Sequence, residues 1–141
     1  MKEKILIVED NPRNLRLLTM ILRDKDYNLL QATDGEEALA VAGEERPDLI
    51  IMDIQLPKID GLEVTKRLRQ TPGFSQIPIV AITAYAMKGD REKAFAAGCD
   101  AYVLKPINTR QLPGLVVEML ERSRYSPQLS GDASGEENPG N

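Results

Sequence analysis

The chain alternates between short apolar runs and longer segments with the 3.6-residue period of a helix. Three runs, at residues 5–8, 49–52 and 79–82, are nearly unbroken and rich in β-branched residues. Continuous runs of that length are typical of strands that are buried on both faces of a parallel sheet. Two weaker runs, at residues 29–32 and 101–104, predict strands that lie nearer an edge.

Five helices are predicted between and after these runs. They begin at Asn11-Pro12, Asp34 and Asp60, and the last two span about residues 88–97 and 109–124. Asn11 and Asp34 are favourable N-cap residues, and Gly98 suits the left-handed end of the fourth helix. The third helix has a stop signal at Thr71-Pro72-Gly73. Pro113 falls in the first turn of the fifth helix, where it is expected to shift or loosen the start.

The alternation gives five βα units at a spacing of roughly two dozen residues, which predicts a right-handed, doubly wound α/β fold. From residue 126 onward the composition changes to three Gly, two Pro, three Ser and three acidic residues, with little to bury. Such a segment cannot offset its conformational entropy by forming a core. We therefore expect one domain at residues 1–125 and a disordered tail at residues 126–141.

The charge of the chain argues against two classes of partner. The net charge of −4 is concentrated in the tail, because all 18 basic residues and 19 of the 22 acidic residues lie in residues 1–125. A domain with a net charge near −1 lacks the basic surface expected for binding nucleic acid or an anionic membrane. No apolar stretch is long enough for a membrane span, and no leader sequence precedes the first strand, so we expect a cytoplasmic protein.

The absence of histidine removes several kinds of chemistry together. The 141 residues include none, so Ser/His/Asp catalysis, His-ligated zinc and histidine acid–base catalysis are excluded. The single cysteine, Cys99, cannot form a disulfide within the chain and agrees with a reducing compartment.

Polar residues follow the predicted strands at the point where each strand ends. Glu9 and Asp10 follow the first strand, Asp53 the third, Thr83 the fourth and Lys105 the fifth. In a parallel sheet these ends share one edge, and the ligand sites of open α/β sheets form outside that edge.

Three neighbouring carboxylates repel one another unless a cation lies between them, and an all-oxygen set suits Mg²⁺. A lysine and a hydroxyl would neutralise and orient the oxygens of a phosphoryl group. Taken singly, each residue has a plain structural explanation: Asp10 as a helix cap, Thr83 as a strand end and Lys105 as a solvated charge. Their convergence on one edge favours a functional site.

In order and spacing these residues are similar to the CheY-like receiver domains of two-component signalling. The resemblance runs from Lys4 to about Glu121 and rests on motifs at residues 5–11, 48–57, 60–61, 79–84 and 102–106. The segments around residues 11–14, 56–61 and 84–87 look most like DivK-type single-domain regulators, and the receiver modules of hybrid kinases look similar too. The resemblance implies a flavodoxin-like, five-stranded parallel sheet of order 2-1-3-4-5 with five helices.

The resemblance also implies a role for each site residue. Asp53 would accept the phosphoryl group. Mg²⁺ would be held by Asp53, by Asp10, by Glu9 through water and by the main-chain carbonyl of Gln55. The acidic pair is Glu-Asp where Asp-Asp is commoner in the family. Thr83 and Lys105 would bind the phosphoryl oxygens.

Further roles implied by the resemblance concern switching. Tyr102 would change rotamer as Thr83 is drawn inward, and Pro106 would follow a cis peptide that aims Lys105. The side chains of Gln55 and Tyr85 would tune the lifetime of the phosphoryl group through water access.

The expected function is a signalling switch in two-component phosphorelay rather than an enzyme with a separate substrate. A histidine kinase or histidine phosphotransferase would supply the phosphoryl group, since this chain has no histidine of its own, and the domain would catalyse its own phosphorylation and dephosphorylation. Output would be to a protein that binds the face formed by the fourth helix, fifth strand and fifth helix. The chain is expected to be a monomer or weak dimer without a nucleic-acid or membrane partner.

Three alternatives remain open at this point. The chain could be the excised receiver module of a hybrid kinase. It could be an aspartate-nucleophile phosphatase of the haloacid dehalogenase type, although the second Asp of that class is replaced here by Gln55. It could also be an unphosphorylated pseudo-receiver or flavodoxin-like binding module, against which the complete acidic set argues.

Overall fold

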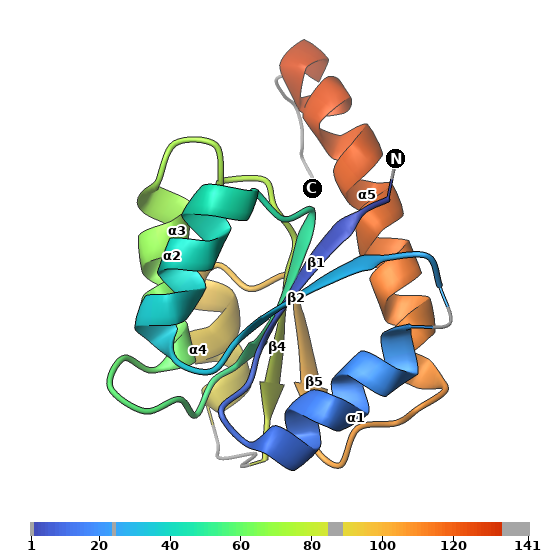
Figure 1. Ribbon diagram of the computed structural model, residues 1–141. Coiled ribbons are helices and arrows are strands. Elements are labelled where there is room, and N and C mark those ends of the chain that lie inside the picture. Colours follow the sequence, from blue (N-terminus) through green and yellow to red (C-terminus); the bar gives the residue numbers. More distant parts are fainter. Residues whose placement is uncertain (1, 24, 85–88, 134–141) are drawn as a thin grey trace.

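Five parallel strands form one sheet in the order β2-β1-β3-β4-β5 (Figure 1). Their bounds are β1 (Lys4–Val8), β2 (Asn28–Ala32), β3 (Leu49–Asp53), β4 (Ile79–Thr83) and β5 (Ala101–Leu104). The computed structural model describes residues 2–23, 25–84 and 89–133, with residues 124–133 described by their backbone alone. The predicted order is confirmed, and the two weaker apolar runs form the two edge strands.

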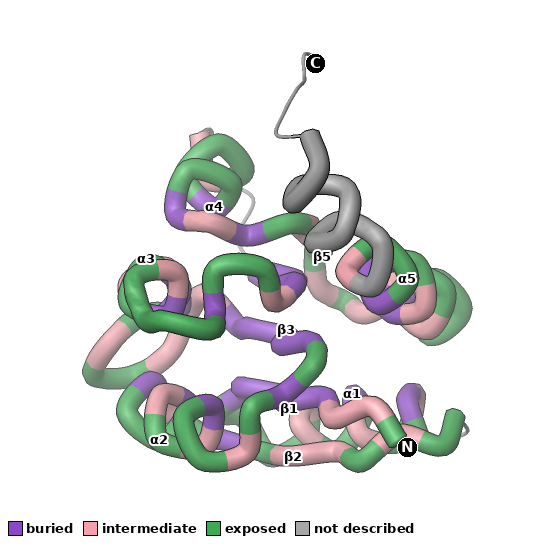
Figure 2. The backbone as a smooth tube through the Cα atoms, turned by 90° about the horizontal axis from the view of Figure 1, so that it is seen from above, coloured by how far each residue is buried: buried purple, intermediate pink, exposed green. Residues whose placement is uncertain are grey.

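Helices cover both faces of the sheet, with α2, α3 and α4 on one side and α1 and α5 on the other (Figure 1). Their bounds are α1 (Pro12–Leu22), α2 (Gly35–Glu45), α3 (Gly61–Gln70), α4 (Asp90–Ala97) and α5 (Gln111–Ala133). The central strands lie between the two helix layers and are almost completely buried (Figure 2). This burial explains why their sequences are apolar without alternation.

Successive residues of each central strand point into two different cores. In β3, Ile50 and Met52 pack beneath α2, α3 and α4, whereas Leu49 and Ile51 pack beneath α1 and α5. The same alternation holds along β1 and β4 because side chains of a strand point to opposite faces in turn. Each fully buried Leu or Ile contributes about 1.5–3 kcal/mol to folding, so both cores are needed for stability.

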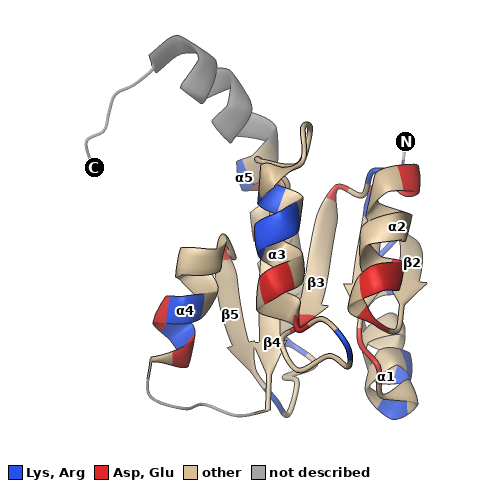
Figure 3. Cartoon of the chain, turned by 90° about the vertical axis from the view of Figure 1, so that its left-hand side faces the viewer, with Lys and Arg blue, Asp and Glu red and all other residues tan. Residues whose placement is uncertain are grey.

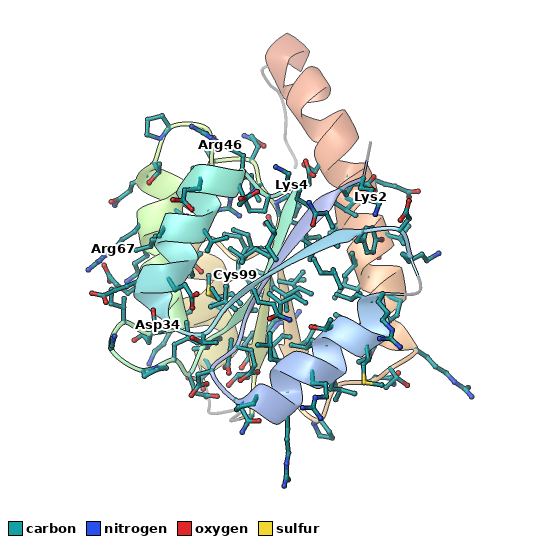
Figure 4. The ribbon with its side chains drawn as sticks, viewed as in Figure 1. Lys2, Lys4, Asp34, Arg46, Arg67 and Cys99 are labelled. Carbon is teal, nitrogen blue, oxygen red and sulfur yellow. The ribbon has the colours of Figure 1, made fainter. Side chains whose placement is uncertain are left out.

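The helix starts follow the capping signals in the sequence. The Asn11 side chain accepts hydrogen bonds from the N–H groups of Arg13 and Asn14, and Asp34 accepts one from Glu37 N–H. The Glu37 carboxylate in turn accepts from the N–H of Thr33, the residue before this N-cap, at 2.8 Å. Figure 4 shows Asp34 at one end of α2 and Arg46 at the other.

The carboxyl end of α4 agrees with the sequence, and the start of α5 lies close to the predicted position. Gly98 ends α4 with a φ of 118°, a conformation that favours glycine. Helix α5 is preceded by Asn108, whose side chain accepts from the N–H groups of Arg110 and Gln111, and Leu112 N–H donates to Asn108 C=O. Helix α5 begins at Gln111, slightly later than the predicted start at about Thr109, in the direction of the shift expected from Pro113.

Helix α5 continues to Ala133, past the end near residue 124 that its apolar pattern predicts. Its last turns therefore overlap the segment that was expected to be disordered. Side chains from residue 124 onward and all of residues 134–141 lie outside the described residues, so the tail from residue 126 stays a prediction. Lys88, the expected start of α4, also lies outside them, and α4 begins at Asp90.

Arg69 joins several segments at the sheet edge opposite the polar strand ends. Its guanidinium donates to the carbonyl oxygens of Phe74, Ile77 and Gly98 at 2.6–3.0 Å and pairs with Asp100 at 2.8 Å. Asp100 also accepts from the N–H of Ile79 at 2.8 Å. The clamp fixes the end of α3, the end of α4 and the entry to β4 relative to one another.

The outer faces of α3 and α4 carry both basic and acidic residues (Figure 3). Arg67, for example, projects outward from α3 and pairs with Glu63 at 3.1 Å (Figure 4). Cys99 lies inside the molecule, and burial raises the pKa of its thiol to about 11. Within the part of the chain that the structure describes, no helix is both long and apolar enough to cross a membrane.

Candidate functional site

The predicted polar residues meet at the carboxyl edge of the sheet. Asp53 and Thr83 are the last residues of β3 and β4, Glu9 directly follows β1, and Lys105 directly follows β5. The parallel register places Asp53 opposite Ile82, so the ends of β3 and β4 lie beside each other. Apart from Asp10, the members of this group are buried or partly buried, in contrast to ordinary surface charges.

Three carboxylates form a cluster at this edge. Glu9, Asp10 and Asp53 each offer an oxygen, and these oxygens all lie within 4.8 Å of one another. Asp10 is exposed, whereas Glu9 and Asp53 are only 1% and 3% exposed. Buried carboxylates this close repel each other strongly unless a cation lies beside them.

Lys105 supplies the protein's own cation. Its Nζ lies 3.1 Å from Asp53 Oδ2 and 3.0 Å from Glu9 Oε1. Burial lowers the pKa of Lys105, but hydrogen bonds and charge from Glu9 and Asp53 outweigh that effect, so the pKa is raised and the ammonium stays charged. Burial, followed by the nearby Asp53 carboxylate, raises the pKa of Glu9.

The two oxygens of Glu9 differ in their partners. Oε2 accepts a hydrogen bond from Asn11 N–H at 3.1 Å. Oε1 is fully buried and, despite its ion-pair distance to Lys105, accepts no well-aligned hydrogen bond from any of the described residues. A buried carboxylate oxygen without a hydrogen-bond donor is costly unless another positive group contacts it. Because the cluster offers only oxygen ligands, it suits a hard cation such as Mg²⁺, bound directly or through a water.

Both carboxylate oxygens of Asp53 are held. Oδ1 accepts a hydrogen bond from Gln55 N–H at 3.0 Å, and Oδ2 accepts one from Lys105 Nζ. The loop after Asp53 is tight, because Gly61 N–H donates to Ile54 C=O at 2.8 Å. A Cβ at Gly61 would lie 2.8 Å from Ile54 Cα and closer still to the carbonyl oxygen of Asp53. Only glycine lets α3 start so close to the backbone of Asp53.

The Gln55 side chain has a role that the sequence did not reveal. Its Nε2 donates to Thr83 Oγ1 at 2.7 Å, and its Oε1 accepts from Ala84 N–H at 3.3 Å. The sequence interpretation assigned Gln55 a main-chain carbonyl ligand and a general influence on phosphoryl lifetime. No sequence signal identifies a contact between a loop residue and the end of a strand 28 positions further along the chain.

The remaining predicted residues lie beside this centre. The Lys105-Pro106 peptide is cis, as predicted. Tyr102 is partly buried on β5, where it lines a groove of about 1170 Å³ between α4 and α5 together with Phe95 and Leu115. Burial, and then the charge of Asp90, raises the pKa of Tyr102. Tyr85 lies outside the described residues, and the switch role of Tyr102 stays a prediction.

This fold and this edge are those of a response regulator receiver domain, and the chain belongs to that family. The family model matches residues 5–117. Among curated proteins, the chain is similar to the polar-differentiation response regulator DivK of Brucella anthropi, with 47% identity over 108 residues, covering 77% of this chain and 88% of that protein. DivK of Brucella ovis is 46% identical over the same shares. The chain is therefore a response regulator of two-component signalling, of the DivK type.

Solved structures give the same result. The receiver domain of the sensor histidine kinase PA1611 from Pseudomonas aeruginosa, which has a magnesium ion coordinated in its active-site cleft, superposes with a TM-score of 0.79. It is 35% identical, and the match covers 86% of this chain and 99% of that one. A CheY-like receiver domain protein from Methanospirillum hungatei superposes with a TM-score of 0.83 at 28% identity, covering 89% and 99%.

Proposed function

We propose that Asp53 accepts a phosphoryl group from a phosphohistidine of a cytoplasmic histidine kinase or histidine phosphotransferase, in a reaction that needs Mg²⁺. The observation that carries the proposal is the environment of Asp53, a buried carboxylate held on one oxygen by a backbone N–H and on the other by Lys105. These contacts fix the direction of a nucleophile that has no competing histidine, serine or cysteine beside it among the described residues.

In the proposed reaction an Asp53 oxygen forms a bond to phosphorus as the bond to the donor nitrogen breaks. The electron pair of that bond returns to the donor imidazole, which binds a proton. Lys105 keeps its own proton, because its pKa is raised, and offsets charge on the transferring oxygens.

Asp10, Asp53, the main-chain carbonyl of Gln55 and, through water, Glu9 would hold the metal ion. The buried Glu9 oxygen without an aligned donor supports this assignment. When bound, Mg²⁺ would supply positive charge to the phosphoryl oxygens and relieve the repulsion within the acidic cluster.

The output of the switch would pass through Thr83. Engagement of its hydroxyl by the phosphoryl group would favour one of two conformations of the β4 end, with Tyr102 following. The groove over β5 between α4 and α5 supports the proposal that a downstream protein binds that face. The domain would then catalyse loss of its own phosphoryl group to water and return to the first conformation.

Transfer of ³²P from a phosphorylated histidine kinase, or mobility on a Phos-tag gel, tests the proposal. We expect Mg²⁺-dependent labelling of the wild type and of Asp26→Asn, a matched change at a carboxylate whose side chain is 86% exposed. Asp53→Asn should not be labelled. Equal labelling of Asp53→Asn and the wild type would refute the assignment of the acceptor.

Two alternatives to this function were the dehalogenase-type phosphatase and the pseudo-receiver. The family assignment removes the dehalogenase-type phosphatase. Mg²⁺-dependent binding of beryllofluoride, an analogue of the phosphoryl group, tests the pseudo-receiver alternative. A domain that does not accept a phosphoryl group should not bind this analogue.

A further inference from the structure

Gln55 connects the nucleophile's loop to the end of β4, and we propose that its carboxamide is a latch that phosphorylation must release. In this proposal Gln55 holds Thr83 and Ala84 in the arrangement seen here, and the switch completes only when the Ala84 N–H leaves Gln55 and the Thr83 oxygen leaves the position that Gln55 fixes. The inference rests on the proposed function of Asp53 and adds a positioning residue to it.

The contacts of the carboxamide are made at both of its ends. Nε2 lies 2.7 Å from Thr83 Oγ1, and Oε1 lies 3.3 Å from Ala84 N. Because a backbone N–H can only donate, the end that faces Ala84 must be the oxygen, and the end that faces Thr83 must then be the NH₂ group. Thr83 is 1% exposed, so its side chain has little room to leave this contact without a concerted movement.

A phosphoryl group on Asp53 would compete for the same partners. It brings oxygens that accept hydrogen bonds to the place where β3 and β4 end side by side. The N–H of Ala84 has a single proton, which Gln55 Oε1 already uses. The Thr83 hydroxyl can accept from Gln55 and still donate elsewhere, so for Thr83 the latch acts by fixing where its oxygen lies.

The backbone of Gln55 provides a second link between Asp53 and Thr83. Its N–H donates to Asp53 Oδ1 at 3.0 Å, so one residue contacts the nucleophile through its main chain and the β4 end through its side chain. A change of geometry at Asp53 therefore acts directly on the residue that holds Thr83. The latch affects the equilibrium between the arrangement in which Gln55 holds Thr83 and Ala84 and the one in which the phosphoryl group binds them. This effect differs from control of water access during hydrolysis.

Calorimetric titration with beryllofluoride in saturating Mg²⁺ tests the latch. The proteins are the wild type, Gln55→Met, Thr83→Ala and the double variant, since Met keeps the length of Gln but not its hydrogen bonds. We expect Gln55→Met to bind beryllofluoride about three- to tenfold more tightly, the value of one or two modest hydrogen bonds that no longer have to be broken. In the Thr83→Ala background the gain should fall below about twofold, because the shorter contact is already absent.

Two further measurements make the result unambiguous. Gln55→Asn keeps the amide on a side chain one methylene shorter, which cannot span both partners, and should tighten binding in the same direction. In ¹H–¹⁵N spectra without beryllofluoride, Gln55→Met should move the Ala84 amide resonance, whereas Lys58→Met, in the same loop, should not.

The outcomes separate the latch from the proposed function. Unchanged or weaker binding by Gln55→Met, or an equal gain in both Thr83 backgrounds, overturns the latch and leaves Asp53 as the acceptor. No beryllofluoride binding by the wild type, or equal binding by Asp53→Asn, overturns the proposed function and the latch with it.

Discussion

Lys105→Met removes the ammonium group that, among the described residues, pairs with both buried carboxylates, while keeping most of the alkyl stem. At about 3 Å and an effective dielectric constant of about 20, each ion pair is worth about 5 kcal/mol. Desolvation of the ammonium, which is 16% exposed in this site, takes back several kcal/mol of this gain. We therefore expect Lys105→Met to lower the free energy of unfolding by about 2–4 kcal/mol at pH 7.5 without Mg²⁺.

The raised pKa of Glu9 determines how the stability loss of Lys105→Met should vary with pH. The pKa of Glu9 is raised in the folded protein, so Glu9 binds more protons folded than unfolded between its usual pKa and the raised one. Stability associated with Glu9 is fully present below the usual pKa and is lost as pH rises through the folded value. Removing Lys105 raises that value further, so the penalty should be largest at neutral pH and shrink as pH falls towards 4.5.

Urea unfolding followed by circular dichroism at pH 7.5 and pH 5 measures both effects. Lys58→Met is the matched control, because Lys58 is 62% exposed and its carboxylate contacts are at 3.7–3.8 Å, so its loss should cost less than about 0.5 kcal/mol. Adding Asp53→Asn to Lys105→Met should recover much of the lost stability. A penalty that is the same at both pH values would show that packing, and not charge, is the contribution of Lys105.

Three other changes test the rest of the structure. Gly61→Ala should lower the free energy of unfolding by more than about 2 kcal/mol, since its Cβ would collide with the Asp53 backbone. A thermal midpoint within about 2 °C of the wild type, roughly the shift of a 0.5 kcal/mol change, would contradict this. Arg69→Lys should cost about 2–3 kcal/mol in urea unfolding, because an ammonium cannot replace the fork that joins Phe74, Ile77 and Gly98; a cost under about 0.5 kcal/mol would mean that the clamp is redundant. Cys99, buried and with a pKa of about 11, should react with Ellman's reagent at pH 8 only after urea is added, and fast reaction in native buffer would count against the packed interior described here.

The central strands were predictable because burial on both faces leaves a plain signature, whereas the order of the strands was implied by the family resemblance. Residues 49–52 are apolar without a break, and both of their faces are covered in the structure. The convergence of Asp53, Thr83 and Lys105 followed from the same logic, since parallel strands place their carboxyl ends at one edge. Helix starts at Asn11 and Asp34 were predictable because capping depends on residues within one turn.

What could not be predicted depends on loop geometry or on competing local preferences. The contact of Gln55 with Thr83 joins a loop to the end of β4, and its existence depends on a side-chain direction that no periodic pattern encodes. The carboxyl end of α5 was placed near residue 124 because apolar residues become scarce there, yet the helical backbone continues to Ala133. Helix propagation needs no apolar face once a helix is started, so loss of periodicity is a weak stop signal.

The alternation of β-strand side chains between two cores has a consequence for how such a domain diverges. Ile50 and Met52 face one set of helices and Leu49 and Ile51 the other, so each helix layer is supported by its own residues of the same strand. A substitution that reshapes the packing of α1 and α5 can be absorbed without repacking α2, α3 and α4. Asp53 and Thr83, at the ends of the shared strands, remain common to both layers, and the groove between α4 and α5 is the place where the two layers contribute to one surface.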